Sequence, residues 1–149
     1  MARIKLQLPR HFSFSCLIPI RITDINYGDH VGNDTILSII HEARVQFLQE
    51  LGYSEMHFAG AGMIMADAAL EFKSELFYGD AVIASVAVGE ISRIGFELFY
   101  KLETTRKTDN KKILVAAART GMICYDYDRK KIVNIPEEAK NRLLGSTTI

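Results

Sequence analysis

Residues 34–51 read DTILSIIHEARVQFLQEL. Apolar residues recur there every three or four positions, the spacing of one face of an α-helix, and they are Ile36, Ile39, Ile40, Ala43, Phe47, Leu48 and Leu51. Leu37 and Val45 widen the apolar arc to about half of the circumference. A helix this apolar must be enclosed by other structure. We expect Asn33 to cap its start and Gly52 to end it.

Alternating apolar and polar residues on both sides of this helix predict β-strands. The alternating segments are residues 14–22, 66–73, 82–88, 94–102 and 113–125. Pro19 indicates an edge strand, Gly121 predicts a bulge, and Pro136 begins a short terminal helix. Because short turns join the last four strands, we expect strands that follow each other to pair antiparallel. The pattern predicts an α+β fold, in which a curved antiparallel sheet of about five strands wraps one long central helix.

The composition predicts a single domain over residues 1–149. Lys and Arg number 18, and so do Asp and Glu, so nothing in the charge favours binding to nucleic acid or to an anionic membrane. Cys16 and Cys124 have no partner at metal-ligand spacing, so we expect buried thiols and no metal site. The apolar run 12–20 is too short to span a bilayer, which predicts a cytoplasmic protein without a membrane span.

The segment that could carry chemistry is residues 21–44, RITDINYGDHVGNDTILSIIHEAR. Its connection into the helix carries five polar candidates, Asp24, Asn26, Asp29, His30 and Asn33. A helix start exposes free N–H groups and the positive end of the dipole, which would stabilise a developing oxyanion. A neighbouring carboxylate or imidazole could activate water. The alternative is a capping loop, in which Asp, Asn and Gly serve turn geometry alone.

At these residues the sequence resembles the hotdog-fold thioesterases of the 4-hydroxybenzoyl-CoA thioesterase and YbgC-like group. Their signature is approximately D-x-D-x-x-G-H-V-x-N, followed by a long helix that often contains E-A-R. The matching residues are Asp24, His30, Val31, Asn33 and Glu42-Ala43-Arg44. Segment 70–80 is similar to the family's second strand and turn, and 118–136 to its last strand and closing segment. The resemblance implies the hotdog fold.

The resemblance also implies hydrolysis of an acyl-CoA or acyl-carrier-protein thioester to free acid and thiol, without cofactor or metal. The carbonyl would meet the backbone N–H near Asn33. The family's usual catalytic carboxylate falls at Asn26, which cannot accept a proton, and Asp29 stands where the family has Gly. The acting carboxylate is then Asp24, our first choice, or Asp29; otherwise the enzyme uses His30.

Three further expectations follow. Glu42 is a candidate substrate-binding residue, although a solvated helix glutamate is the common case. Family members pair their sheets edge to edge, so the resemblance implies a homodimer or homotetramer with sites at the subunit boundary. Asn26 keeps open a second function, a hotdog module that binds acyl thioesters without cleaving them. A hydratase on the same fold would resemble a different Asp/His loop, which this sequence does not contain.

Overall fold

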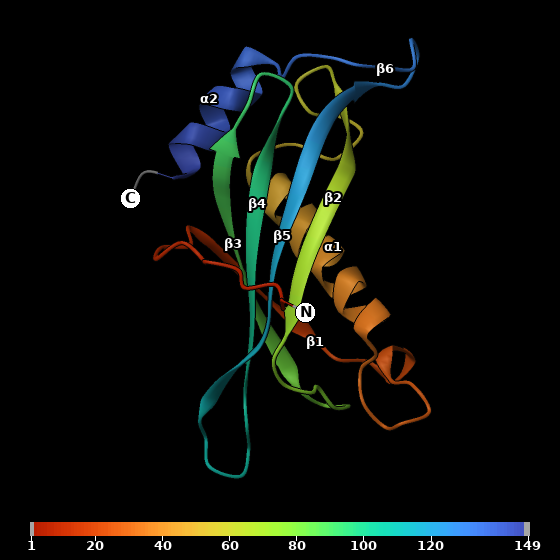
Figure 1. Cartoon of the computed structure of the whole chain (residues 1–149), viewed down its shortest axis with the longest axis vertical. Helices are drawn as coiled ribbons and strands as arrows, with labels where there is room; N and C mark the ends of the chain where they lie inside the picture. The colour runs from red at the N-terminus through yellow and green to blue at the C-terminus, as the bar shows by residue number, and fades with distance from the viewer. Residues whose placement is uncertain (1, 148–149) are drawn as a thin grey trace.

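The computed structural model describes residues 2–147, and its order of elements is a strand, a long helix, further strands and a terminal helix (Figure 1). The elements are β1 (Phe14–Pro19), the 3-10 turn η1 (Ile22–Asp24), α1 (Asn33–Glu50), β2 (Gly62–Phe72), β3 (Ala81–Ile91), β4 (Gly95–Thr105), β5 (Lys112–Asp126), β6 (Lys131–Ile132) and α2 (Glu137–Ser146). Helix α1 lies behind the sheet in Figure 1. The α+β hotdog fold is confirmed.

The sheet is antiparallel and its strand order is β1-β3-β4-β5-β2, with the two-residue strand β6 added to β5. The first strand is an edge strand, as Pro19 indicated. The expectation that consecutive strands pair is wrong for β2 and β3, because β4 and β5 separate them. The connection of residues 73–80 therefore crosses from one side of the sheet to the other.

The bulge expected near Gly121 lies on the opposite strand. Met65 pairs with Met122 and Asp67 with Gly121, so the extra residue is Ala66 in β2. The glycine has a different reason: a Cβ at position 121 would collide with the carboxylate of Asp67. Gly121 therefore marks a close approach of a side chain from the neighbouring strand.

Helix α1 begins one residue earlier than expected. Asn33 is its first helical residue, and the cap is Gly32, whose carbonyl oxygen accepts from the N–H groups of Thr35 and Ile36 at 3.1 and 3.2 Å. The prediction that Asn33 caps the helix is therefore wrong. Gly52 follows the helix with φ +86°, as expected of a residue that ends one.

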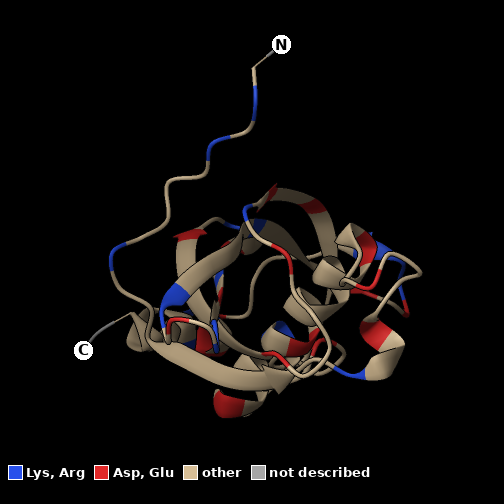
Figure 2. Cartoon of the chain, turned by 90° about the horizontal axis from the view of Figure 1, so that it is seen from below, with Lys and Arg blue, Asp and Glu red and all other residues tan. Residues whose placement is uncertain are grey.

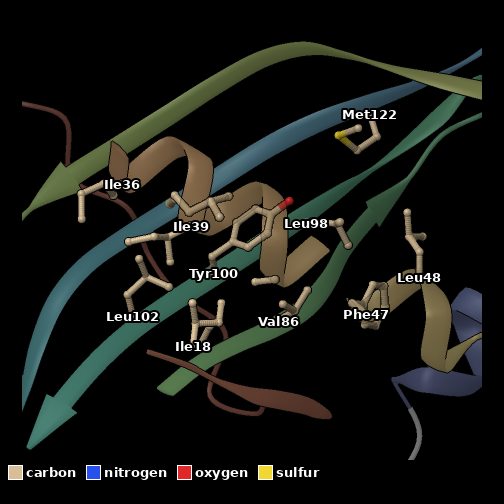
Figure 3. Close-up of a cluster of buried hydrophobic side chains, with 14 of the residues drawn as sticks. Ile18, Ile36, Ile39, Phe47, Leu48, Val86, Leu98, Tyr100, Leu102 and Met122 are labelled. Atoms are coloured by element: carbon tan, nitrogen blue, oxygen red, sulfur yellow. The ribbon is translucent and has the colours of Figure 1, made fainter. Parts of the chain in front are cut away.

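The core is formed between α1 and the inner face of the sheet (Figure 3). Ile40, Phe47 and Leu48 on the helix are at most 1% exposed. Each such side chain contributes about 1.5–3 kcal/mol on burial. The apolar face read from residues 34–51 is therefore the face that holds the helix to the sheet.

The two cysteines differ in burial. Cys124 is fully buried, which raises the pKa of its thiol to about 11. Cys16 is half-buried, and its thiol pKa is raised first by burial and then by the negative charge of Glu42. Both thiols are therefore protonated at neutral pH, which suits a structural role.

Candidate active site

The loop before α1 closes on itself at Asn26. The Asn26 N–H donates to the carbonyl oxygen of His30 at 3.0 Å, and the Asp29 N–H donates to the carbonyl oxygen of Asn26 at 3.2 Å. The side-chain oxygen of Asn26 accepts from the Gly28 N–H at 2.8 Å. Turn geometry therefore accounts for much of what Asn26 does here.

Asp29 occupies the tip of this loop with φ +65°, in the left-handed region that favours glycine. Its side chain is exposed. Such a backbone conformation suits glycine, the residue that the family signature has at this position. Aspartate is one of the few other residues that adopt it readily.

The end of the loop is tied to the connection between β2 and β3. The Val31 N–H donates to the carbonyl oxygen of Leu76 at 2.9 Å, and Leu76 is 1% exposed. A cavity of about 220 Å³, the helix-start hollow, opens beside this contact. It is lined by His30, Val31, Asn33, Ile36, Phe72, Lys73, Ser74, Glu75 and Val115.

The first amides of α1 are free to bind a ligand. Within residues 2–147, the N–H groups of Asn33 and Asp34 donate to no protein acceptor. The first turn of an α-helix leaves such groups unpaired and carries the positive end of the dipole. An oxygen that gains negative charge beside Asn33 would therefore be stabilised.

The orientation of His30 fixes which ring nitrogen is available. Its Nδ1 lies 3.1 Å from the carbonyl oxygen of Val31. A carbonyl oxygen only accepts, so Nδ1 carries the proton in this contact. The neutral ring then presents the lone pair of Nε2, which is the arrangement that a general base needs.

Two predicted residues lie in a different cavity, the β1 groove, which has a volume of about 330 Å³. It is lined by Leu17, Ile18, Pro19, Arg21, Asp24, Ser38, Ile39, Glu42 and Gln46. The Asp24 carboxylate accepts from the Arg21 N–H at 2.8 Å and lies 3.5 Å from its guanidinium. Glu42 is exposed and accepts from the Gln46 side chain at 2.9 Å.

Four of the six predicted residues are thus divided between opposite edges of the sheet, since β1 and β2 are its two edge strands. His30 and Asn33 line the helix-start hollow, beside the end of β2. Asp24 and Glu42 line the β1 groove. Asn26 and Asp29 lie in the intervening loop and, in the described part of the chain, line neither cavity.

Sequence analysis missed a buried polar network between α1 and the sheet. Arg44 is 5% exposed and donates to the hydroxyl of Tyr100 at 3.2 Å and to the carboxylate of Glu55 at 3.3 Å. Figure 3 shows Tyr100 reaching from β4 toward α1, and its hydroxyl lies 2.7 Å from that of Thr120. Burial raises the pKa of Tyr100, so the phenol stays protonated. The sequence did contain a signal for this network, because Arg44 is a charged residue on the apolar face of the helix.

The polar residues that follow β2 were also missed as site candidates. Lys73, Ser74 and Glu75 line the helix-start hollow. They were interpreted only as part of a strand-and-turn resemblance, because no local pattern in 70–80 indicates that the chain turns back toward the helix start. Their position depends on the crossing connection.

Residues 2–147 contain no group of three or more His, Cys, Asp or Glu side chains placed to hold a metal ion. No helix of this part of the chain is long and apolar enough to cross a membrane.

The sequence matches the thioesterase-like superfamily over residues 20–143, most of the chain. The protein belongs to this superfamily. It is accordingly a thioester hydrolase, and both the resemblance and the enzyme class expected from the loop motif are confirmed. The match begins after β1, so the first residues of the chain lie outside it.

Individual relatives agree with this placement. A 1,4-dihydroxy-2-naphthoyl-CoA hydrolase from Microcystis aeruginosa is 29% identical over 111 residues, which cover 72% of this chain and 76% of the relative. A 4-hydroxybenzoyl-CoA thioesterase mutant complexed with 4-hydroxybenzoyl-CoA superposes with a TM-score of 0.79 at 15% identity, covering 87% and 97% of the two chains. A thioesterase superfamily protein from Jannaschia sp. CCS1 superposes with a TM-score of 0.80 at 12% identity, covering 93% of this chain and 86% of that protein. The two structural likenesses show the shared fold.

Proposed function

We propose that this thioesterase hydrolyses an acyl-CoA or acyl-carrier-protein thioester at the helix-start hollow, and that His30 is the base. The observation that carries the proposal is the pairing of two features at one cavity. The first is the helix start, where the amides of Asn33 and Asp34 are unpaired and Asn33 lines the cavity; the second is His30, which lines the same cavity and whose Nδ1 contact leaves the lone pair on Nε2. An electrophilic carbonyl and an attacking water could therefore be bound next to each other.

In the proposed reaction, water attacks the thioester carbon while Nε2 of His30 takes its proton. The carbonyl oxygen becomes an oxyanion, which accepts hydrogen bonds from the helix-start amides beside Asn33. Collapse of the tetrahedral intermediate breaks the carbon–sulfur bond, and the thiolate takes the proton from the imidazolium. One water and one thioester give one acid and one thiol. Each oxyanion donor of this kind contributes a factor of about 10²–10³ in rate.

The choice of His30 departs from our first expectation, Asp24. Two observations support the departure: the Asp24 carboxylate lines the β1 groove, and it is engaged by Arg21. Asp29 is exposed at the loop tip, and its positive φ, which aspartate tolerates, accounts for its presence there. Asn26 would keep the loop closed and so hold His30 at the wall of the hollow.

The second candidate function is binding without hydrolysis. Asn26 supports it, because an amide replaces the family's usual carboxylate and is already engaged by Gly28. In a protein of this kind, His30 would position the thioester without taking a proton.

Release of free thiol from short-chain, long-chain and aryl acyl-CoAs tests both candidates. Hydrolysis of any of them supports the first function. Saturable binding of the same compounds without thiol release would support the second and contradict the first.

Assembly into a dimer or tetramer is a further part of the proposal. In the described chain β2 is an edge strand of 11 residues that pairs only with β5. Met65, next to the bulge residue Ala66, is 40% exposed. A second subunit beside β2 would cover such apolar surface and adjoin the helix-start hollow. Light scattering at micromolar concentration tests this, and a strictly monomeric enzyme would contradict it.

A further inference from the structure

Residues 2–13 form an extended arm that lies outside the family match. Apolar Ile4, Leu6 and Leu8 alternate in it with polar residues, and in Figure 2 the arm stands away from the body and carries Lys and Arg but no acidic residue. The arm contacts strands β2 and β4. The Leu6 N–H donates to the carboxylate of Glu71, and the ammonium of Lys101 lies 4.8 Å from the centre of the Phe12 ring.

Between this arm and the end of β2 lies a cavity of about 860 Å³, which we name the arm cavity. Its volume falls in the range of small-molecule sites, about 300–1,000 Å³. It is lined by Arg3, Ile4, Lys5, Leu6, Leu8, Leu70, Glu71, Phe72, Lys73, Leu114 and Ala117. Phe72 and Lys73 also line the helix-start hollow, so the two cavities share a wall.

The arm cavity is cationic in a protein whose total charge is zero. Arg3, Lys5 and Lys73 line it, and Glu71 is its one carboxylate. Lys73 lies 2.9 Å from Glu71, and the charge of Lys5 also acts on this carboxylate, so three basic side chains against one acidic one leave the lining with an excess of positive charge. Hydrogen bonds from the Leu6 N–H and from Lys73 lower the pKa of Glu71, so the carboxylate stays ionised and remains committed to these partners.

We propose that the arm cavity binds the phosphate groups of the thioester's thiol half, with Arg3 and Lys5 as their partners. The proposal rests on the proposed function, since the acyl half would occupy the adjoining hollow. Phosphate is common to coenzyme A and to the phosphopantetheine of a carrier protein. Pantetheine without phosphate lacks the recognised group.

The test compares two double variants that each remove two positive charges. Arg3→Ala/Lys5→Ala removes those of the arm cavity. Lys107→Ala/Lys111→Ala removes exposed charges from the hairpin loop between β4 and β5 and is the matched control. Binding of CoA, 4′-phosphopantetheine and pantetheine is measured by calorimetry, with circular dichroism as the check on folding.

For the arm variant we expect CoA affinity to fall about fivefold, the loss expected for two exposed ion pairs, and to become less sensitive to salt. Pantetheine affinity stays unchanged, and so does CoA affinity in the control. If the affinity for 4′-phosphopantetheine falls together with that for CoA, the recognised group is the phosphate that the two compounds share. If only the affinity for CoA falls, the recognised groups are the phosphates of its nucleotide. Equal CoA binding in both variants, or wild-type binding of pantetheine as tight as that of CoA, would overturn the proposal.

Failure of hydrolysis is a separate result. If the enzyme releases no thiol but Arg3→Ala/Lys5→Ala lowers its affinity for CoA, the arm subsite is supported and the proposed reaction is contradicted. If both variants hydrolyse acyl-CoA and the matching acyl-pantetheine with equal kcat/KM, the reaction is supported and the arm subsite is contradicted.

Discussion

The Nδ1 atom of His30 lies 3.1 Å from the carbonyl oxygen of Val31, the residue that also donates its N–H to Leu76. One peptide segment therefore fixes both the tautomer of the imidazole and the position of the helix start. In this arrangement the Nε2 lone pair belongs to a ring whose direction is set by the backbone.

His30→Ala is expected to lower kcat/KM for acyl-CoA hydrolysis by about 10²–10⁴, the usual contribution of a general base. His30→Asn gives a similar loss, because an amide can donate to Val31 but takes no proton. The control is His57→Ala, in an exposed loop. Thiol-release kinetics provide the measurement, and full activity of His30→Ala would exclude His30 as the base.

Asp24→Asn is expected to change turnover by less than about tenfold and stability by about 0.5 kcal/mol, because the side chain of Arg21, its ion-pair partner, is 74% exposed to solvent. The amide oxygen still accepts from the Arg21 N–H. A loss of several decades in kcat with an unchanged melting temperature would instead identify Asp24 as the base, as the family resemblance first implied.

Asp29→Gly is expected to retain activity, and Asp29→Val to lose about 1–2 kcal/mol of stability, since φ +65° is costly for a β-branched residue. Chemical denaturation measures the second effect. A variant Asp29→Gly that folds normally but no longer releases thiol would show that this carboxylate takes part in the reaction.

Arg44→Ala is expected to lower the free energy of unfolding by about 2–3 kcal/mol, because it removes charged hydrogen bonds from the core and leaves Glu55 without this partner. Tyr100→Phe removes the hydroxyl between Arg44 and Thr120, and we expect a smaller loss of about 1 kcal/mol. Urea unfolding distinguishes the two. Equal losses would mean that the Arg44–Glu55 contact adds nothing.

Two glycines provide a stability test of opposite sign. A Cβ on Gly95 would overlap the carbonyl oxygen of Met122, a backbone atom that cannot rotate away, so Gly95→Ala costs about 1–3 kcal/mol. A Cβ on Gly145, in α2, meets nothing within 4 Å, and Gly145→Ala stabilises by up to about 1 kcal/mol. Thermal melts of both variants check the signs; a stabilised Gly95→Ala protein would contradict the register of β4 and β5.

Helix α1 and the edge position of β1 could be predicted because both follow from local patterns. The apolar spacing within 34–51 defines the buried face, and Pro19 cannot serve a central strand. The position of β2 in the sheet could not be predicted. Residues 73–80 can extend over about 26 Å, whereas three interstrand steps span about 14 Å. A short connection therefore does not require neighbouring strands once the sheet is curled.

The candidate site was predicted in part. Glycine, aspartate and histidine before a helix indicate the loop, and Asn33 and His30 do lie at one cavity. The position of Asp24 in a different cavity depends on η1, whose turn is closed by the Arg21–Asp24 contact. The opposite wall, Lys73 to Glu75, is set by the crossing connection, which no short-range pattern in the sequence encodes.

The hydrogen bond from Val31 to Leu76 has a mechanical consequence. It fastens the loop that carries His30 to a connection whose residues form the facing wall of the hollow. The contact therefore couples the positions of the two segments, and the leucine at this contact is buried. Under the proposed function, the length of this connection between β2 and β3 would affect acyl-chain selectivity, and we expect a single inserted residue there to change the size of the hollow.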